Sequence, residues 1–125
     1  MIKRISLAGM ILFYMAAGIN HFWHPDPYYA LIPLYLPWPV LINTVSGAAE
    51  ILLGILLIFS CTRKFAAYGI MVLLLLFIPA HIRMIQEGWC TGTGFCLTGW
   101  ATWLRLFPGQ FILIAWAWWH RKTEY

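Results

Sequence analysis

The chain has 125 residues, of which 62% are hydrophobic and only 10% are charged. Soluble proteins carry about a quarter charged residues, so this composition excludes an ordinary soluble fold. The formal net charge of +4 does not indicate nucleic-acid binding, because most basic residues occur as pairs that flank apolar runs. These pairs are Lys3-Arg4, Arg63-Lys64 and Arg121-Lys122.

Four apolar runs follow one another along residues 1–125, at about 5–22, 40–59, 65–85 and 101–119. Each is close to the roughly 20 residues that a helix needs to cross the hydrocarbon core of a bilayer. Short links make consecutive helices antiparallel neighbours. We therefore expect an all-α fold with a single integral membrane domain, built as a four-helix up-and-down bundle.

The basic residues predict the orientation of this bundle. Six of the eight Lys and Arg residues lie near the chain ends or in the short 60–64 link. Cytoplasmic segments of membrane proteins are enriched in Lys and Arg, so both termini and this link are expected in the cytoplasm. The other two links then face outward.

The first outer link, residues 23–39, holds five prolines together with several aromatic and aliphatic side chains. Such a Pro- and aromatic-rich interfacial segment is expected to lie along the membrane surface. Between Pro27 and Pro33 there is room for about one and a half helical turns, which we expect to cover the outer mouth of the bundle.

The second apolar run carries a polar, small-residue stripe. Asn43, Ser46, Gly47, Glu50 and Gly54 fall within a narrow arc at 100° per residue. Glu50 lies about 15 Å from the outer end of the run, which is near the bilayer midplane. Two interpretations stay open: Glu50 serves a pocket, or a neutral Glu50 only bonds helices together.

Polar residues of the first and fourth runs fall at similar depths. Tyr14 and His21 share one helical face, with His21 at the outer end. Arg105 is expected about 6 Å inside the outer boundary. Gln110 follows Pro108 and lies close to the depth of the second-run carboxylate.

In the third run, Pro79 is expected to kink the helix, because proline frees a backbone carbonyl. His81 and Arg83 follow it and point to nearly opposite faces. One should face inward while the other reaches the headgroups, and periodicity does not decide which.

These polar residues predict a funnel between the helices, open to the outside and walled by apolar side chains, which is typical of a small-molecule site. Taken singly, each histidine or arginine is equally explained as an interfacial residue. The candidate pocket residues are His21, Asn43, Ser46, Glu50, His81, Arg105 and Gln110.

A dedicated metal site is not expected. His21 and His81 could in principle hold haem iron from facing helices, but no His or Cys spacing typical of a metal site occurs. No cofactor motif, phosphate-binding loop or nucleophile motif is evident either, so the sequence does not decide whether the chain is an enzyme.

The third link contains the sequence WCTGTGFC, whose glycines and threonines predict a tight turn. Cys90 and Cys96 lie in this link, on the expected oxidising side. A disulfide between them is therefore predicted, with two free thiols as the alternative.

Residues 16 to 84 resemble the DoxX family of small bacterial four-helix membrane proteins. The residues that carry the resemblance are Gly18, His21, Phe22, Pro25, Tyr28, Pro33, Leu36, Pro37, Ser46, Gly47, Glu50, Gly54, Thr62-Arg63-Lys64 and Pro79-Ala80-His81. The resemblance implies a place in a bacterial cytoplasmic (inner) membrane. Members and relatives of that family are tied to quinone-linked oxidoreduction, membrane oxidoreductase complexes and receptor-assembly chaperoning, so membership alone does not settle activity.

Two hypotheses follow. The first is a quinone- or lipid-binding subunit of a membrane redox system, in which His21, Glu50 and His81 contact the bound headgroup and a partner protein supplies electrons. The second is a non-enzymatic ligand-binding or membrane-protein assembly factor that uses the same pocket. In both, the partners are the lipid bilayer and a hydrophobic small molecule, with no role for nucleic acid.

Overall fold

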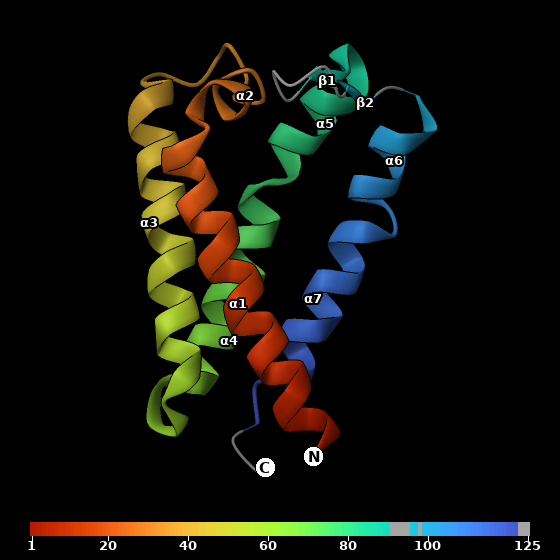
Figure 1. The fold of residues 1–125 in the computed structure, drawn as a ribbon. Helices are drawn as coiled ribbons and strands as arrows, with labels where there is room; N and C mark the ends of the chain where they lie inside the picture. The colour runs from red at the N-terminus through yellow and green to blue at the C-terminus, as the bar shows by residue number, and fades with distance from the viewer. Residues whose placement is uncertain (91–95, 98, 123–125) are drawn as a thin grey trace.

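A computed structural model describes residues 1–90, 96, 97 and 99–122 and is mostly helical (Figure 1). The helices are α1 (Ile2–Trp23), α2 (Pro25–Tyr29), α3 (Pro39–Ile58), α4 (Ser60–Leu76), α5 (Ile78–Glu87), α6 (Trp100–Leu106) and α7 (Gly109–Trp119). Two short strands, β1 (Trp89–Cys90) and β2 (Cys96–Leu97), pair antiparallel between α5 and α6. The expectation of an all-α chain is confirmed, with this small hairpin as an addition.

Three stretches of the described chain are long and apolar enough to cross a membrane, judged by length and composition. They are Ile2–Trp23, Pro39–Ile58 and Ser60–Glu87, the last containing α4 and α5. The fourth apolar run differs from the expected single helix. It is divided into α6 and α7 at Phe107 and Pro108, because proline has no backbone N–H to continue the helical hydrogen bonds.

The α4–α5 break lies at Phe77, two residues before Pro79, where a kink was expected. Gln110 of α7 donates from Nε2 to the carbonyl oxygen of Leu74 at 2.7 Å. That carbonyl lies in the last turn of α4 and also accepts from the backbone N–H of Phe77 at 3.3 Å. The side chain of Gln110 therefore joins the α6–α7 segment to the α4–α5 segment close to the point where each is interrupted.

Helices α1 and α3 pack against each other, and they lie side by side in the upper part of the molecule as drawn in Figure 1. A Cβ atom on Gly18 would lie 2.7 Å from the carbonyl oxygen of Gly47 and 2.6 Å from Cγ1 of Ile51. A Cβ atom on Gly47 would lie 2.7 Å from the Cβ of His21. Only glycine fits at both positions without a shift of the neighbouring helix.

The hydrophobic core lies at the end of the molecule where α1 begins and α7 ends (Figure 1). It combines side chains of α1, α3, α4 and α7, which pack together away from the hairpin. The core residues are Leu7, Met10, Tyr14, Leu57, Ala66, Ile70, Leu74 and Ala117.

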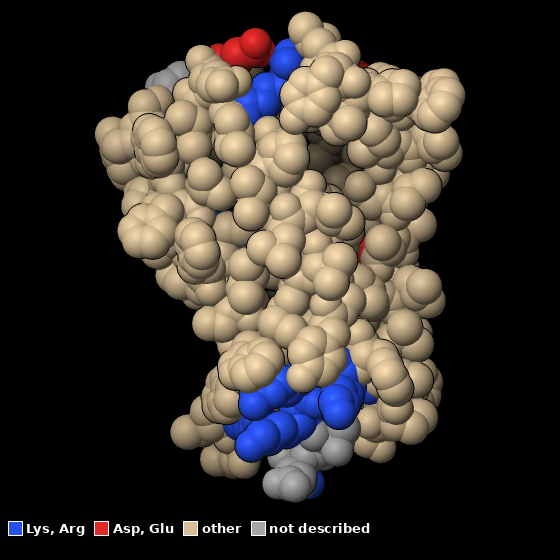
Figure 2. Space-filling view, turned by 180° about the vertical axis from the view of Figure 1, so that it is seen from behind, with Lys and Arg blue, Asp and Glu red and all other residues tan. Residues whose placement is uncertain are grey.

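The same end carries most of the positive charge, and Figure 2 shows Lys and Arg side chains gathered there. Arg63 is buried and donates from Nε to the carbonyl of Leu57 at 2.9 Å and from Nη2 to that of Ile58 at 3.2 Å. These are end carbonyls of α3, so the arginine caps that helix.

A polar link joins α1 to the end of α7 beside this basic surface. Ser6 Oγ lies 2.9 Å from His120 Nε2, and Trp116 Nε1 donates to Ser6 Oγ at 2.8 Å. His120 is fully buried. Burial, followed by the nearby charges of Lys3 and Arg63, lowers the pKa of His120 below its ordinary value.

Gly18→Ala should lower the free energy of unfolding by about 1–3 kcal/mol, because the added methyl group overpacks the α1–α3 contact. Denaturant titration of the purified chain in detergent, followed by circular dichroism, measures this change. Gly9→Ala is the matched control: its Cβ would meet nothing closer than 3.9 Å, and alanine should raise helix stability by up to about 1 kcal/mol. Equal effects at the two positions would contradict the close-contact interpretation.

The pH dependence of stability should report His120. The unfolded chain takes up the proton near pH 6.5 and the folded chain only at lower pH, so stability falls as the pH drops below 6.5. The slope from one such group is at most about 1.4 kcal/mol per pH unit. His120→Gln should flatten the profile in this range, whereas the exposed His24→Gln should not; the same profile in all three proteins would refute the prediction.

Candidate functional site

A cavity of about 500 Å³ lies between the helices in the half of the molecule that carries the hairpin. All seven candidate pocket residues line it: His21, Asn43, Ser46, Glu50, His81, Arg105 and Gln110. Its innermost lining residues on α1 and α3 are Phe13, Tyr14 and Glu50. The polar stripe of α3 therefore faces an open volume as well as the neighbouring helix.

The centre of the site is a hydrogen-bonded cluster of His21 and Asn43. The Asn43 side chain donates from Nδ2 to the backbone carbonyl of His21 at 2.9 Å, which lies in the last turn of α1, where carbonyls need outside donors. Its Oδ1 then accepts from His21 Nδ1, 2.7 Å away. This arrangement places a proton on Nδ1 and turns Nε2 toward the cavity.

His21 Nε2 lies 3.5 Å from Glu50 Oε2, and both side chains are buried. A contact between these two atoms needs one proton, carried by either the imidazole or the carboxyl group. The pair can therefore hold and pass a proton at the inner part of the cavity.

Tyr28 covers this cluster from the outside. Its ring stacks on the His21 ring with centroids 3.9 Å apart, and its hydroxyl accepts from Asn20 Nδ2 at 2.7 Å. Burial raises the pKa of Tyr28, with the charge of Glu50 acting in the same direction. The Tyr28 side chain therefore stays neutral and fixes the imidazole plane.

Three buried polar atoms in the described part of the chain meet no hydrogen-bond criterion: Tyr14 Oη, His81 Nδ1, and Glu50 Oε2, which has only the 3.5 Å contact with His21 Nε2. They come from α1, α3 and α5, and all three residues line the cavity. Buried polar atoms are rarely left unpaired, because each costs about 1–3 kcal/mol. Three such residues around one cavity are typical of a site for a molecule with hydrogen-bonding groups.

The structure resolves the alternative between His81 and Arg83. His81 is buried and faces the cavity. Arg83 instead donates from Nε to the carbonyl of Ala30 at 2.8 Å and pairs through Nη2 with Glu87 Oε2 at 3.2 Å.

Arg105 is exposed at the rim of the cavity, and the amide nitrogen of Gln110 is occupied by its bond to α4.

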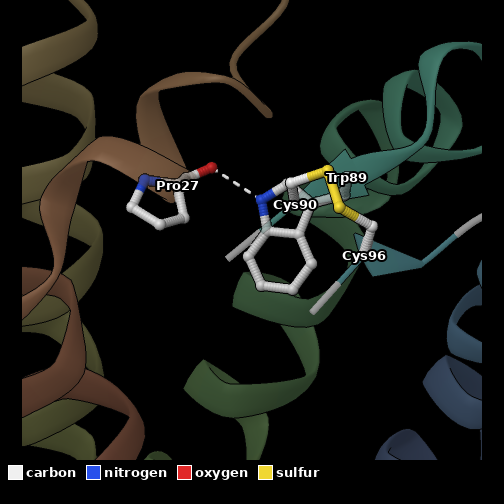
Figure 3. The surroundings of a disulfide bond; sticks show 4 residues. All are labelled: Pro27, Trp89, Cys90 and Cys96. Carbon is white, nitrogen blue, oxygen red and sulfur yellow. Dashed lines mark hydrogen bonds between the residues drawn. A yellow bond between two sulfur atoms is a disulfide. The ribbon is translucent and has the colours of Figure 1, made fainter. Parts of the chain in front are cut away.

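The outer cap, residues 24–38, closes the end of the cavity. Leu31 and Pro33 are buried and line it, and α2 begins at Pro25, slightly before the expected position. Trp89 Nε1 donates to the carbonyl of Pro27 at 2.7 Å (Figure 3). The cap is thus tied to the hairpin as well as to α1 and α5.

The hairpin itself is cross-linked, since Cys90 and Cys96 form a disulfide in the structure (Figure 3). The two cysteines also face each other in the strand pairing. The tight turn expected in this link falls on residues 91–95, which lie outside the described residues. Within the described ranges, no group of three or more His, Cys, Asp or Glu side chains could hold a metal ion.

Sequence reasoning did not single out Tyr14 or Tyr28 as site residues. Tyr14 lies two helical turns before His21 on one face of α1, so the signal was present in the periodicity. The role of Tyr28 depends on how the outer cap folds back over α1, which no periodic pattern reports.

Residues 10–121 match the family described as Domain of unknown function (DUF8561), so the chain belongs to that family. No curated protein and no solved structure matches the chain.

Asn43→Leu should lower the free energy of unfolding by about 1–3 kcal/mol, because it leaves the His21 carbonyl and Nδ1 buried without partners. The neighbouring Thr44→Val is the control, since the Thr44 hydroxyl is exposed and bonds only the Val40 carbonyl within its own helix. That change should stay within about 0.5 kcal/mol. Denaturant titration measures both, and an undiminished stability in Asn43→Leu would contradict the assigned role.

Proposed function

We propose that this member of the DUF8561 family is a membrane protein that binds a hydrophobic molecule with a polar head, of the quinone or lipid class, in the cavity. In this proposal it serves as the ligand-holding subunit of a membrane-associated redox system. The observation that carries the ligand proposal is that Tyr14, Glu50 and His81, each with a buried polar atom that makes no hydrogen bond, line one largely apolar cavity.

The membrane part of the proposal rests on the apolar stretches and on the charge distribution. Three stretches are long enough to span a bilayer, and α6 with α7 would form a fourth, interrupted crossing of a four-helix up-and-down bundle. The basic end would face the cytoplasm of a bacterial inner membrane, and the cavity would lie in the outer half.

The redox part rests on the resemblance to the DoxX family and on the His21–Glu50 pair. A quinone ring takes up two electrons and two protons when it is reduced, and the electrons would come from a partner protein. Glu50 and His21, 3.5 Å apart, would supply or accept a proton at the inner end of the cavity.

A second candidate function is a non-enzymatic ligand-binding or membrane-protein assembly factor. The feature that favours it is the surface of the outer cap, where Leu34, Tyr35 and Trp38 are strongly exposed. Exposed aromatic and aliphatic side chains of this kind suit a protein partner. Mass spectrometry of the co-purified small molecule tests the redox role, since a quinone supports a redox subunit and a phospholipid or sterol-like molecule supports the second candidate.

Glu50→Gln should keep the fold and reduce the amount of co-purified ligand, because glutamine preserves volume and hydrogen bonding but cannot ionise. Glu50→Leu should reduce it further, since no polar atom then remains at that position. Glu87→Gln is the matched control: Glu87 is exposed and lies outside the cavity lining. Ligand content per mole of protein is the measurement, and wild-type content in both Glu50 variants would sink the proposed role.

The proposed orientation can be tested on the natural cysteines. Cys61 is exposed and free at the basic end, whereas Cys90 and Cys96 are paired. A membrane-impermeant thiol reagent should therefore leave the wild-type chain unlabelled in intact cells and label it once the membrane is opened. In a Cys61→Ser background, Asp26→Cys in the outer cap should be labelled in intact cells. Labelling of Cys61 from outside would reverse the orientation.

A further inference from the structure

We propose that the ligand enters the cavity sideways from the lipid, between α3 and the α4–α5 segment, with its polar head leading. This proposal rests on the proposed function, because it assumes that the cavity holds an amphiphilic molecule and that the helices lie in a bilayer. It adds the route of loading and the orientation of the bound molecule.

The water-facing end of the cavity is closed by the outer cap, which is fastened at three places. Asn20 holds Tyr28, Arg83 holds the Ala30 carbonyl, and Trp89 holds the Pro27 carbonyl, each by a hydrogen bond of 2.7–2.8 Å. Buried Leu31 and Pro33 complete this wall. A molecule entering from water would have to break several of these contacts.

The side of the cavity between α3 and α4 is open, because residues that line the cavity there are also exposed on the surface of the molecule. Leu41 and Val45 of α3 and Leu76 of α4 line the cavity, yet they are 55%, 58% and 68% exposed. All three are aliphatic, so the edge of the opening matches hydrocarbon chains. Phe13, Leu36 and Arg105 also line the cavity and are exposed, but they lie on other elements. The three aliphatic residues come from the neighbouring helices α3 and α4, and together they mark a lateral portal, which we define as Leu41, Val45 and Leu76.

The arrangement of the helices explains why the opening lies here. Above the break at Phe77, α5 packs against α6, whereas α3 packs against α1 and α4. Figure 1 shows α5 leaning toward α6 as it rises. Seen from behind, the face that carries α4 and α5 is hollowed in its upper half (Figure 2).

The polarity of the lining sets the orientation of the ligand. On α3 the lining runs from aliphatic Leu41 and Val45 near the outer end to Glu50 at the inner end, opposite Tyr14 of α1. The unpaired polar atoms of Tyr14 and Glu50 therefore lie deeper than the portal. A compact polar head satisfies these atoms only if it passes the portal first, with its apolar tail left between the helices and the lipid.

The test uses the chain in lipid vesicles and an isotope-labelled decyl benzoquinone as the probe. Uptake is followed by rapid extraction of the chain into detergent and mass spectrometry of the retained probe. Val45→Trp and Leu76→Trp should slow the initial rate of uptake several-fold. Leu52→Trp should match the wild type, because Leu52 is equally exposed on α3 at 56% but does not line the cavity.

Trp89→Phe tests entry through the outer cap instead, because it removes the hydrogen bond from the hairpin to the outer cap. It should leave the uptake rate unchanged if the probe enters from the side. Faster uptake in Trp89→Phe, or uptake at the wild-type rate in both portal variants, would overturn the lateral route while leaving the binding function standing. A wild-type chain that takes up no probe would overturn the lateral route and the quinone-binding proposal together.

Discussion

The contact between Gly18 and Gly47 is the constraint on which the site depends. With no side chains between them, the backbones of α1 and α3 approach closely enough for Asn43 to bond both the carbonyl and the imidazole of His21. The imidazole then reaches Glu50. A wider spacing of the helices would separate these groups, because the side chain of Asn43 is short. Small residues therefore set the polar geometry, although they make no polar contact themselves.

The two ends of the molecule differ in packing: one holds the hydrophobic core and the other holds the cavity. At the basic end, Arg63 caps α3, and Ser6 with His120 joins the first helix to the last, so the core is closed. At the opposite end, the helices separate around a cavity and are held together by the outer cap. The core therefore lies in the closed half, and Tyr14 stands at the border between this core and the cavity.

Much of the fold and of the site could be predicted from the sequence where helical periodicity carries the information. The apolar runs gave the long helices, and the α3 stripe placed Asn43 and Glu50 on the face that the structure turns inward. Periodicity did not decide between His81 and Arg83, because residues two apart on a helix face opposite ways with equal regularity. The division of the fourth run and the stacking of Tyr28 on His21 depend on tertiary packing, which a single-sequence pattern does not contain.

The bond from Gln110 to the Leu74 carbonyl has a structural consequence. It joins the α4–α5 segment to the α6–α7 segment where each is interrupted. Above this level α5 and α6 pack together. Below this bond α4 packs against α7, as α5 packs against α6 above it, so the two interrupted segments change direction at the same level.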